Sequence, residues 1–241
     1  MPKTGRDGVD KVVSAIIKRI DGDIDGASLA QFVRLIAQSP PVWPVGGRWQ
    51  DTIIGTEIPS GCSVLDLGCG TGELLEKLMT EKDVRVQGLE IDPEAVIACA
   101  VRGVPVLQMD LDEGLEGFPD GGFDYVVLEE TLQTLRRPLT MLGEMLRVGR
   151  HGIVSFPNVA YWRTRLALAL QGSIAVGERG GHAWHATPNI HPLSIRDFLD
   201  WAHEHRVRVT KAFALSEGTV RPLAPEDNLY AQEALFFISR G

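Results

Sequence analysis

Three glycines in five residues, Gly68, Gly70 and Gly72, are the feature of this sequence best suited to hold a small molecule. They follow the mostly apolar segment 64–67 and precede a helical pattern that begins at Glu73. A strand that ends in a glycine-rich turn and continues into a helix marks the ligand-binding edge of an open α/β sheet. Glycine permits positive φ and lets the backbone approach a ligand closely. We therefore expect this turn to form part of a binding site.

Carboxylates recur at the ends of the predicted strands. Asp66 lies near the end of the first strand, Glu90 closes the second, Asp110 follows the third, and Glu129 and Glu130 follow the fourth. The carboxyl ends of parallel strands meet at one edge of the sheet, so these side chains should converge there. Ionised carboxylates accept hydrogen bonds from amines and hydroxyls and attract cations.

The glycine spacing disfavours a dinucleotide. The dinucleotide fingerprint is Gly-x-Gly-x-x-Gly, and counted from Gly68 its sixth position is Glu73. A carboxylate in the first helical turn would also oppose a pyrophosphate, because the positive end of the helix dipole lies there. The pattern therefore counts heavily against a nicotinamide-dependent oxidoreductase, which stays as a third hypothesis.

S-adenosylmethionine suits these residues better than a dinucleotide does. It has no phosphate, and it carries a sulfonium cation, an amino-acid end, a ribose and an adenine. Asp66 can orient the amino group directly or through water, the two oxygens of Glu90 can accept both ribose hydroxyls, and Asp110 can accept from the adenine amino group. The backbone of 68–72 can lie against the methionine portion. We predict that this edge binds S-adenosylmethionine, with S-adenosylhomocysteine as its product or alternative ligand.

The elements that must position these residues alternate between strand and helix. Strands are predicted at 63–67, 84–90, 104–109, 123–128 and 152–156, with helices at about 72–80, 93–102, 138–148, 161–170 and 194–203. Residues 49–58 form a short helix or an extended lead-in, Ser194 is a candidate N-cap, and two last strands lie at about 207–215 and 233–239. This order predicts an α/β fold with a doubly wound, mostly parallel, seven-stranded sheet.

The first 47 residues read as a separate helical appendage. Amphipathic helices are predicted at 9–20 and 28–38, followed by a Pro/Gly linker, so we place the domain boundary near Arg48 and the main domain at 48–241. Residues 21–26 match the start of a calcium-binding EF-hand loop, but Phe32 replaces the bidentate Glu, which favours an acidic turn that caps the second helix. Within the main domain, 157–193 is a lid or insertion.

The composition of the chain argues against several classes of protein. The chain has 241 residues and a net charge of −8, which argues against nucleic acid held by charge. Three cysteines imply no disulfide framework, no segment reads as a signal peptide, and no apolar run approaches the roughly 20 residues that span a bilayer. We expect a cytoplasmic protein without a membrane or nucleic-acid partner.

Two groups of motifs carry a family resemblance. Residues 64–72 and 88–92 resemble class I S-adenosylmethionine-dependent methyltransferases. Further stretches resemble the MetW family of methionine-biosynthesis proteins, and the match covers about 50–240: 102–104, 110–115, 131–133, 144–150, 153–158 and 187–191. Residues 1–45 precede this core, and Glu129-Glu130 stands where smaller polar residues such as Ser-Gln are expected.

The resemblance implies a methyltransferase-like fold, a role in methionine biosynthesis and a homoserine O-acyltransferase as partner. The cofactor-binding residues that we predict are Asp66, Gly68, Cys69, Gly70, Gly72, Glu90, Ile91, Asp110, Leu111 and Glu129. Two functions stay open: an accessory or regulatory partner that binds S-adenosylmethionine, and a methyltransferase that acts on a small molecule.

Residues that could carry methyl transfer are few. Transfer from a sulfonium needs mainly positioning, and a base only where the acceptor must lose a proton. Glu130 and His185 are the candidate bases. His182, His185 and His191 lack the partners of a zinc site, so we predict no metal. Tyr161, Trp162 and Trp184 either line an acceptor pocket or form aromatic core under a lid.

Overall fold

The computed structural model describes residues 48–171 and 190–241. Its helices are α3 (Trp49–Glu57), α4 (Glu73–Lys82), α5 (Pro93–Val101), α6 (Pro138–Val148), α7 (Trp162–Gln171), α8 (Ile195–Glu204) and α9 (Asp227–Tyr230), with 3-10 turns η1 (Leu111–Glu113) and η2 (Leu132–Thr134). Its strands are β1 (Ser63–Leu67), β2 (Arg85–Glu90), β3 (Val106–Gln108), β4 (Phe123–Glu129), β5 (Gly149–Pro157), β6 (Val207–Ser216), β7 (Thr219–Pro222) and β8 (Glu233–Arg240). The appendage, the linker, Trp184, His182 and His185 lie outside the described residues.

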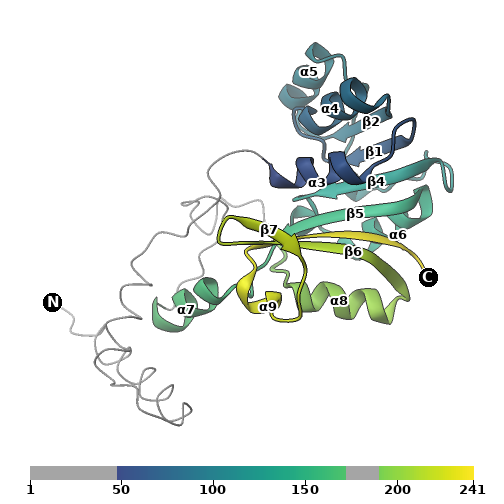
Figure 1. The fold of residues 1–241 in the computed structure, drawn as a ribbon. Coiled ribbons are helices and arrows are strands. Elements are labelled where there is room, and N and C mark those ends of the chain that lie inside the picture. The colour runs from purple at the N-terminus through teal and green to yellow at the C-terminus, as the bar shows by residue number, and fades with distance from the viewer. Residues whose placement is uncertain (1–47, 172–189) are drawn as a thin grey trace, which may run out of the picture.

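The strands form one twisted sheet in the order β3-β2-β1-β4-β5-β8-β6-β7 (Figure 1). Strands β1 to β5 pair in parallel, whereas β8 is antiparallel to both β5 and β6. The chain winds one way from β1 to β3 and the other way from β4 to β5. The topological switch point therefore lies between β1 and β4, where open α/β sheets bind their ligands.

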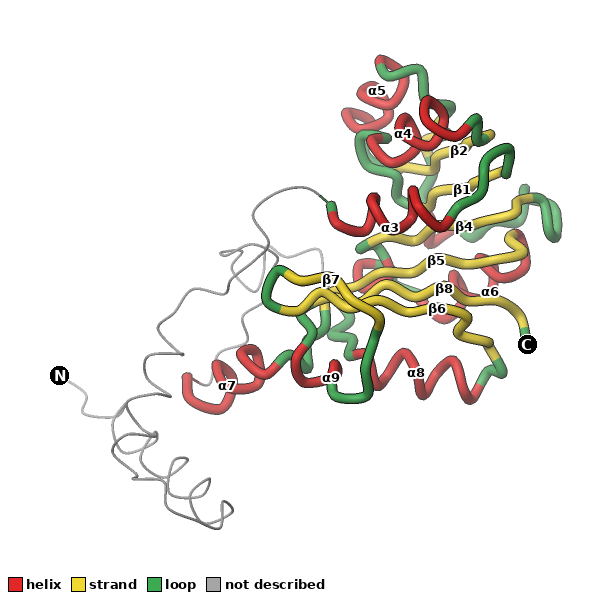
Figure 2. Tube along the Cα trace, in the orientation of Figure 1, coloured by secondary structure: helices red, strands yellow, loops and turns green. Residues whose placement is uncertain are grey.

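The doubly wound α/β fold is confirmed, and the sheet of the described residues has eight strands instead of the predicted seven. The additional strand, β7, pairs with the end of β6 at the edge of the sheet (Figure 2). A two-residue turn joins them, and both turn residues have positive φ, 49° at Glu217 and 79° at Gly218. Such a hairpin turn usually contains Asn-Gly or Asp-Gly, so the Glu-Gly pair gave a weak signal.

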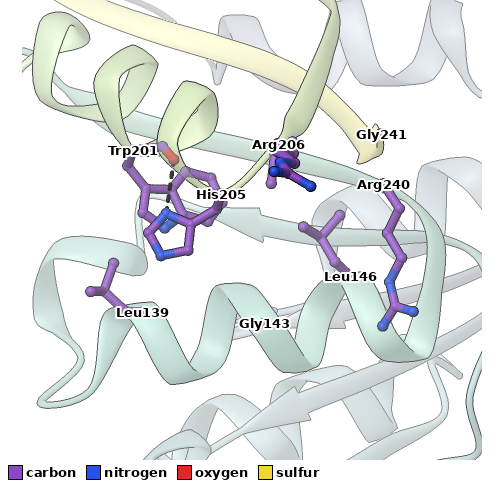
Figure 3. Close-up of a pocket in the computed structure, with 9 residues that line it drawn as sticks. Leu139, Gly143, Leu146, Trp201, His205, Arg206, Arg240 and Gly241 are labelled. Carbon is purple, nitrogen blue, oxygen red and sulfur yellow. Dashed lines mark hydrogen bonds between the residues drawn. The ribbon is translucent and has the colours of Figure 1, made fainter.

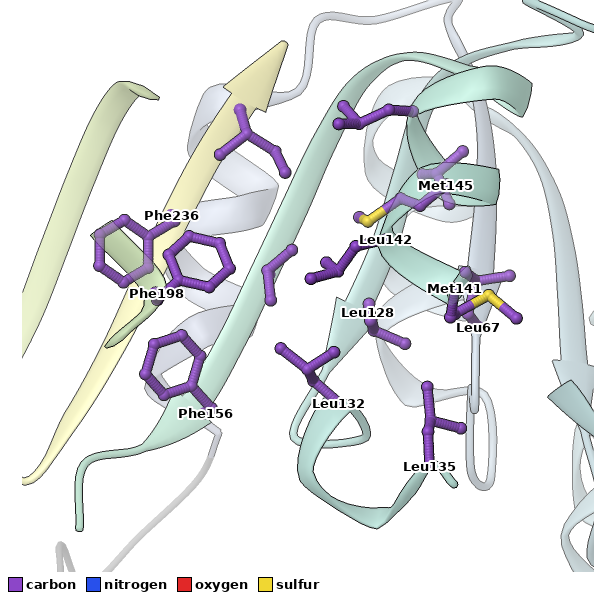
Figure 4. Close-up of a cluster of buried hydrophobic side chains, with 14 of the residues drawn as sticks. Leu67, Leu128, Leu132, Leu135, Met141, Leu142, Met145, Phe156, Phe198 and Phe236 are labelled. Atoms are coloured by element: carbon purple, nitrogen blue, oxygen red, sulfur yellow. The ribbon is translucent and has the colours of Figure 1, made fainter. Parts of the chain in front are cut away.

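Helices cover both faces of the sheet. On one face α3, α4 and α5 pack on a core that includes Ile54, Leu75, Cys99 and Val127. On the other face α6 and α8 pack on a larger core, which Figure 4 shows as an aliphatic group beside three phenylalanines. The helix α8 begins with the predicted Ser194 cap, which Asp197 completes as a capping box. Residues 49–58, left open between helix and extended chain, are helical as α3.

Phe198 of α8 is the anchor of the aromatic group. Its ring centroid lies 5.2 Å from that of Phe156 and 4.6 Å from that of Phe236, and its side chain is 1 % exposed (Figure 4). Phe198→Ala should lower the free energy of unfolding by about 3–5 kcal/mol, because it removes this burial and leaves a cavity. The matched control is Leu199→Ala on the same helix, whose side chain is 37 % exposed. Urea unfolding of both variants measures the difference, and equal losses would contradict this account.

Candidate functional site

The glycine turn is closely packed at Gly68 and has open space at Gly70. Gly68 has a φ of 79°, and a Cβ added there would lie 2.6 Å from the Thr131 hydroxyl oxygen. Gly70 also has a positive φ, 53°, but a Cβ added there would meet no atom within 4 Å. Gly72 caps α4 in the left-handed conformation. The turn thus leaves room for a small molecule at Gly70 while neighbouring side chains fix its course.

The side chain of Cys69 packs between the glycine turn and β2. Its Sγ would lie 2.5 Å from a Cβ added to Gly88 of β2, and it lies 3.9 Å from the Sγ of Cys99. Burial raises the pKa of the Cys69 thiol, and the nearby Asp66 carboxylate raises it further. The side chain is 2 % exposed, so only the Cys69 backbone is placed to meet a ligand.

Glu90 ends β2 and binds the glycine turn. One carboxylate oxygen accepts from the Gly70 N–H at 2.8 Å, and the other accepts from the N–H groups of Ile91 and Asp92 at 2.8 and 2.9 Å. A carboxylate offers about four acceptor sites, so three of these are used. Glu90 can therefore accept one ribose hydroxyl as it stands, and a second only by giving up one of these backbone bonds.

The remaining adenine-side candidates lie close by in different surroundings. Ile91 is 57 % exposed directly after Glu90, which leaves an apolar side chain beside the predicted ribose position. Asp110 caps η1, with one oxygen accepting from the Asp112 N–H at 2.9 Å. Leu111, in contrast, is 6 % exposed and packs in the core on the α6 face.

Three carboxylates and one guanidinium meet at the switch point, and we call Asp51, Asp66, Glu129 and Arg48 the acid cluster. Asp66 pairs in register with Val127, so Asp66 and Glu129 lie on the same face of the sheet, the face that α3 covers. Two nitrogens of Arg48 lie 3.1 and 2.8 Å from the two oxygens of Glu129, and its Nε lies 3.5 Å from Asp51 Oδ1. Asp66 is 1 % exposed, and its Oδ1 has no hydrogen-bond partner.

Burial dominates the electrostatics of the acid cluster. It raises the pKa of Asp66 to about 7, against the attraction of Arg48, and the neighbouring Asp51 and Glu90 add to the rise. Burial likewise raises the pKa values of Glu129 and Asp51, which Arg48 lowers in part. Burial alone would lower the pKa of Arg48, but Glu129 and Asp51 raise it above its ordinary value. The cluster therefore holds protons that a cationic group could displace.

Helix α3 ties the edge of the sheet together. Gln50 Nε2 donates to Glu130 at 2.8 Å and to Glu233 at 3.1 Å, and the Trp49 indole N–H donates to Glu233. Glu130 has a φ of 49°, a left-handed conformation that costs energy for a residue with a side chain. The candidate base is thus held against α3 at the carboxyl edge of β4. His185 lies outside the described residues.

The sequence reasoning did not include Arg48, Asp51 and Gln50 in the site. They precede the glycine turn in the chain, and the tertiary fold alone brings them to the switch point. The Arg-x-x-Asp pairing of Arg48 and Asp51 is a signal that could have found them, but such i,i+3 pairs are common on surface helices. Tyr161, an acceptor-pocket candidate, is 6 % exposed and donates its hydroxyl to Glu217 at 2.6 Å.

A cavity of about 390 Å³ lies between α6 and α8, away from these residues (Figure 3). Its walls include Leu146, Trp201 and Arg240, and His205 Nδ1 lies 2.9 Å from the Trp201 carbonyl oxygen. The helix α8 ends and β6 begins at this edge, so the cavity is at the amino ends of the parallel strands. It is therefore separate from the switch point.

Within 48–171 and 190–241, no three His, Cys, Asp or Glu side chains are grouped so that they could hold a metal ion. In the same ranges, no helix combines the length and the apolar character needed to cross a bilayer.

Comparison with known proteins places this chain in a family. The family model of the methionine biosynthesis protein MetW matches residues 48–238. The bifunctional methionine biosynthesis protein MetXA/MetW of Rhodopirellula baltica is 43 % identical over 195 residues, which are 76 % of this chain and 31 % of that protein. The chain thus spans about a third of the length of this relative.

Solved structures show the same fold at low sequence identity. An S-adenosylmethionine-dependent methyltransferase from Thermotoga maritima has a TM-score of 0.58 and 18 % identity, over 80 % of this chain and 87 % of that one. The [4+2]-cyclase SpnF has a TM-score of 0.58 and 14 % identity, over 88 % and 93 %. The fold is therefore that of class I methyltransferases, and by its sequence this chain belongs to the MetW family.

Proposed function

We propose that this protein binds S-adenosylmethionine and supports or regulates a homoserine O-acyltransferase of methionine biosynthesis. The observation that carries the proposal is the relative in which MetXA and MetW form one polypeptide, with 43 % identity to this chain. Fusion keeps two activities at high effective concentration, as expected for parts that act on one another. We take the MetXA part as the acyltransferase that the family resemblance implies.

The residues at the switch point suit S-adenosylmethionine. The open space at Gly70 accommodates a ligand against the turn, and the unpartnered Oδ1 of Asp66 suits a cationic amino group. Glu90 can accept a ribose hydroxyl, and the exposed Ile91 can contact the adenine. When bound, this cofactor supplies an activated methyl group and a fixed positive charge. The chain's own residues bind and orient it.

Co-expression tests the partner. The full chain and the homoserine O-acyltransferase of the same source are produced together, and the acyltransferase activity is measured with and without added S-adenosylmethionine. We expect the two proteins to co-purify and the activity to change when the chain is present. An acyltransferase that neither binds the chain nor changes in activity would remove this function.

Gly70→Ala tests the position of the ligand, with Gly61→Ala as its matched control. Both glycines have positive φ, 53° and 76°, and neither has an atom within 4 Å of an added Cβ. Both variants should therefore lose about 1 kcal/mol of stability from backbone strain. Only Gly70→Ala should weaken S-adenosylmethionine binding, by about tenfold, because its methyl group enters the ligand space. Calorimetric titration that finds equal affinities for the two variants would contradict this placement.

The alternative is a methyltransferase that acts on a small molecule, and its support is the fold alone. Glu130 is the described candidate for the base, and Gln50 already holds its carboxylate. Incubating the protein with S-adenosylmethionine and a metabolite extract tests the alternative through formation of S-adenosylhomocysteine. Glu130→Gln, which keeps the shape and removes the base, should abolish that formation if the alternative holds.

A further inference from the structure

The acid cluster holds more negative than positive groups. Asp51, Asp66 and Glu129 supply three carboxyls, and Arg48 is the guanidinium that faces them. Arg48 engages both oxygens of Glu129 and approaches Asp51 at 3.5 Å, whereas Asp66 Oδ1 has no hydrogen-bond partner. Asp66 is 1 % exposed and Glu129 is 4 % exposed, so water stabilises their ionised forms poorly. Ionising all three carboxyls is therefore unfavourable unless a further cation is nearby.

The two forms of the expected ligand differ by one methyl group and by the positive charge that this methyl group gives the sulfur. S-adenosylmethionine carries a sulfonium cation, whereas S-adenosylhomocysteine carries a neutral thioether in the same place. Both have the same ammonium, carboxylate, ribose and adenine. Contacts with Glu90, Ile91 and the glycine turn are therefore common to both forms. A preference that changes when a carboxylate is replaced by its amide of the same shape must come from charge.

We propose that Asp51, Asp66, Glu129 and Arg48 together make this site selective for the sulfonium form of its ligand over the neutral thioether form. This inference rests on the proposed function. It adds that the protein responds to the methyl donor and not to the demethylated product. A partner that reports the supply of methyl donor must distinguish the donor from its spent form. The acid cluster distinguishes them by electrostatics at the switch point, where the charge of the ligand enters a site of low dielectric.

The selectivity depends on pH through a defined set of groups. Seven titratable or charged groups of the described residues interact here. They come from the start of α3 (Arg48 and Asp51), from α4 (Glu73 and Lys77), and from the ends of β1, β2 and β4 (Asp66, Glu90 and Glu129). Burial raises the pKa of Asp66 to about 7 and that of Glu129 to about 8, so these two carboxyls ionise as pH rises from 6 to 8, and burial also raises the pKa of Asp51. The preference for the sulfonium form should grow over that interval. The ligand α-amino group also titrates near pH 8, so wild type and variants are compared at the same pH.

Titration calorimetry with both ligands on the full chain at pH 8 tests the proposal. Glu129→Gln should lower the ratio of sulfonium to thioether affinity about tenfold, because the acid cluster loses one unit of negative charge. Arg48→Gln should shift the same ratio the other way, at least threefold, because it removes a positive charge. Glu81→Gln is the control with an equal change of net charge, on the exposed end of α4 away from the switch point, and it should leave the ratio unchanged.

The outcomes separate this proposal from the proposed function. Wild-type protein that binds neither ligand would remove the S-adenosylmethionine site and with it both proposals. Wild-type protein that binds both ligands, with a ratio that Glu129→Gln and Arg48→Gln leave within twofold, would overturn the charge selectivity alone. Because thioether binding itself reports an intact site, a variant that has lost its fold is recognised by the loss of both affinities. If Glu129→Gln or Arg48→Gln loses its fold, Asp51→Asn is used in its place. Asp51→Asn should lower the ratio of sulfonium to thioether affinity, as expected for Glu129→Gln.

Discussion

Glu90→Ala should weaken S-adenosylmethionine binding about 100-fold in calorimetric titration. The substitution removes a charge-assisted hydrogen bond to the ribose, which contributes about 1.5–3 kcal/mol. It also releases the N–H groups of Gly70, Ile91 and Asp92, which the carboxylate holds at 2.8–2.9 Å. The bond from Gly70 ties the glycine turn to the end of β2, so its loss adds the cost of ordering the turn on binding.

Glu90→Gln separates the two contributions. Glutamine keeps one acceptor oxygen and the side-chain length, so the turn retains part of its support. We expect Glu90→Gln to weaken binding about tenfold, which places it between wild type and Glu90→Ala. If both variants bind as tightly as wild type, Glu90 does not contact the ribose. If both bind equally weakly, the charge rather than the support of the turn is decisive.

The local features of the site could be predicted from the sequence because they depend on short segments. The apolar run 64–67 with its glycines specified β1 and the turn, and Glu90 could be placed at the end of β2 by the same local pattern. Ser194 and Asp197 formed the expected cap, since a capping box needs only four consecutive residues. The five helices and seven strands predicted in the described ranges all form, with shifted ends, and 49–58, left open between helix and extended chain, is helical.

The residues of α3 that pair with the carboxylates of the site could not be predicted in this way. Arg48 contacts Glu129 across 81 residues of sequence, and Gln50 contacts Glu233 across 183. Sequence periodicity carries no information on such contacts, because they depend on how α3 packs on the finished sheet. Glu129 was accordingly predicted as a direct ligand of the cofactor, without the guanidinium that faces it. Its role in binding stays a prediction.

The protein without ligand should lose stability as pH rises from 5 to 8, because of Asp66. Its pKa is raised to about 7 by burial, whereas a carboxyl in the unfolded chain ionises near pH 3.9. Between these values the folded state binds a proton that the unfolded state has lost. Raising the pH therefore favours unfolding, by up to about 1.4 kcal/mol per pH unit, and the loss levels off above pH 7.

Asp66→Asn isolates this effect, since asparagine resembles the neutral carboxyl and does not ionise. The variant should match wild type near pH 5 and exceed its free energy of unfolding by about 2 kcal/mol at pH 8, measured by urea unfolding at each pH. Glu81→Gln, at an exposed position, should follow wild type throughout. A difference between Asp66→Asn and wild type that stays constant from pH 5 to 8 would show that Asp66 is already ionised in the folded state. The expected gain of stability, together with weaker S-adenosylmethionine binding by the same variant, would mean that the unpartnered carboxyl is kept for its ligand at the expense of the fold.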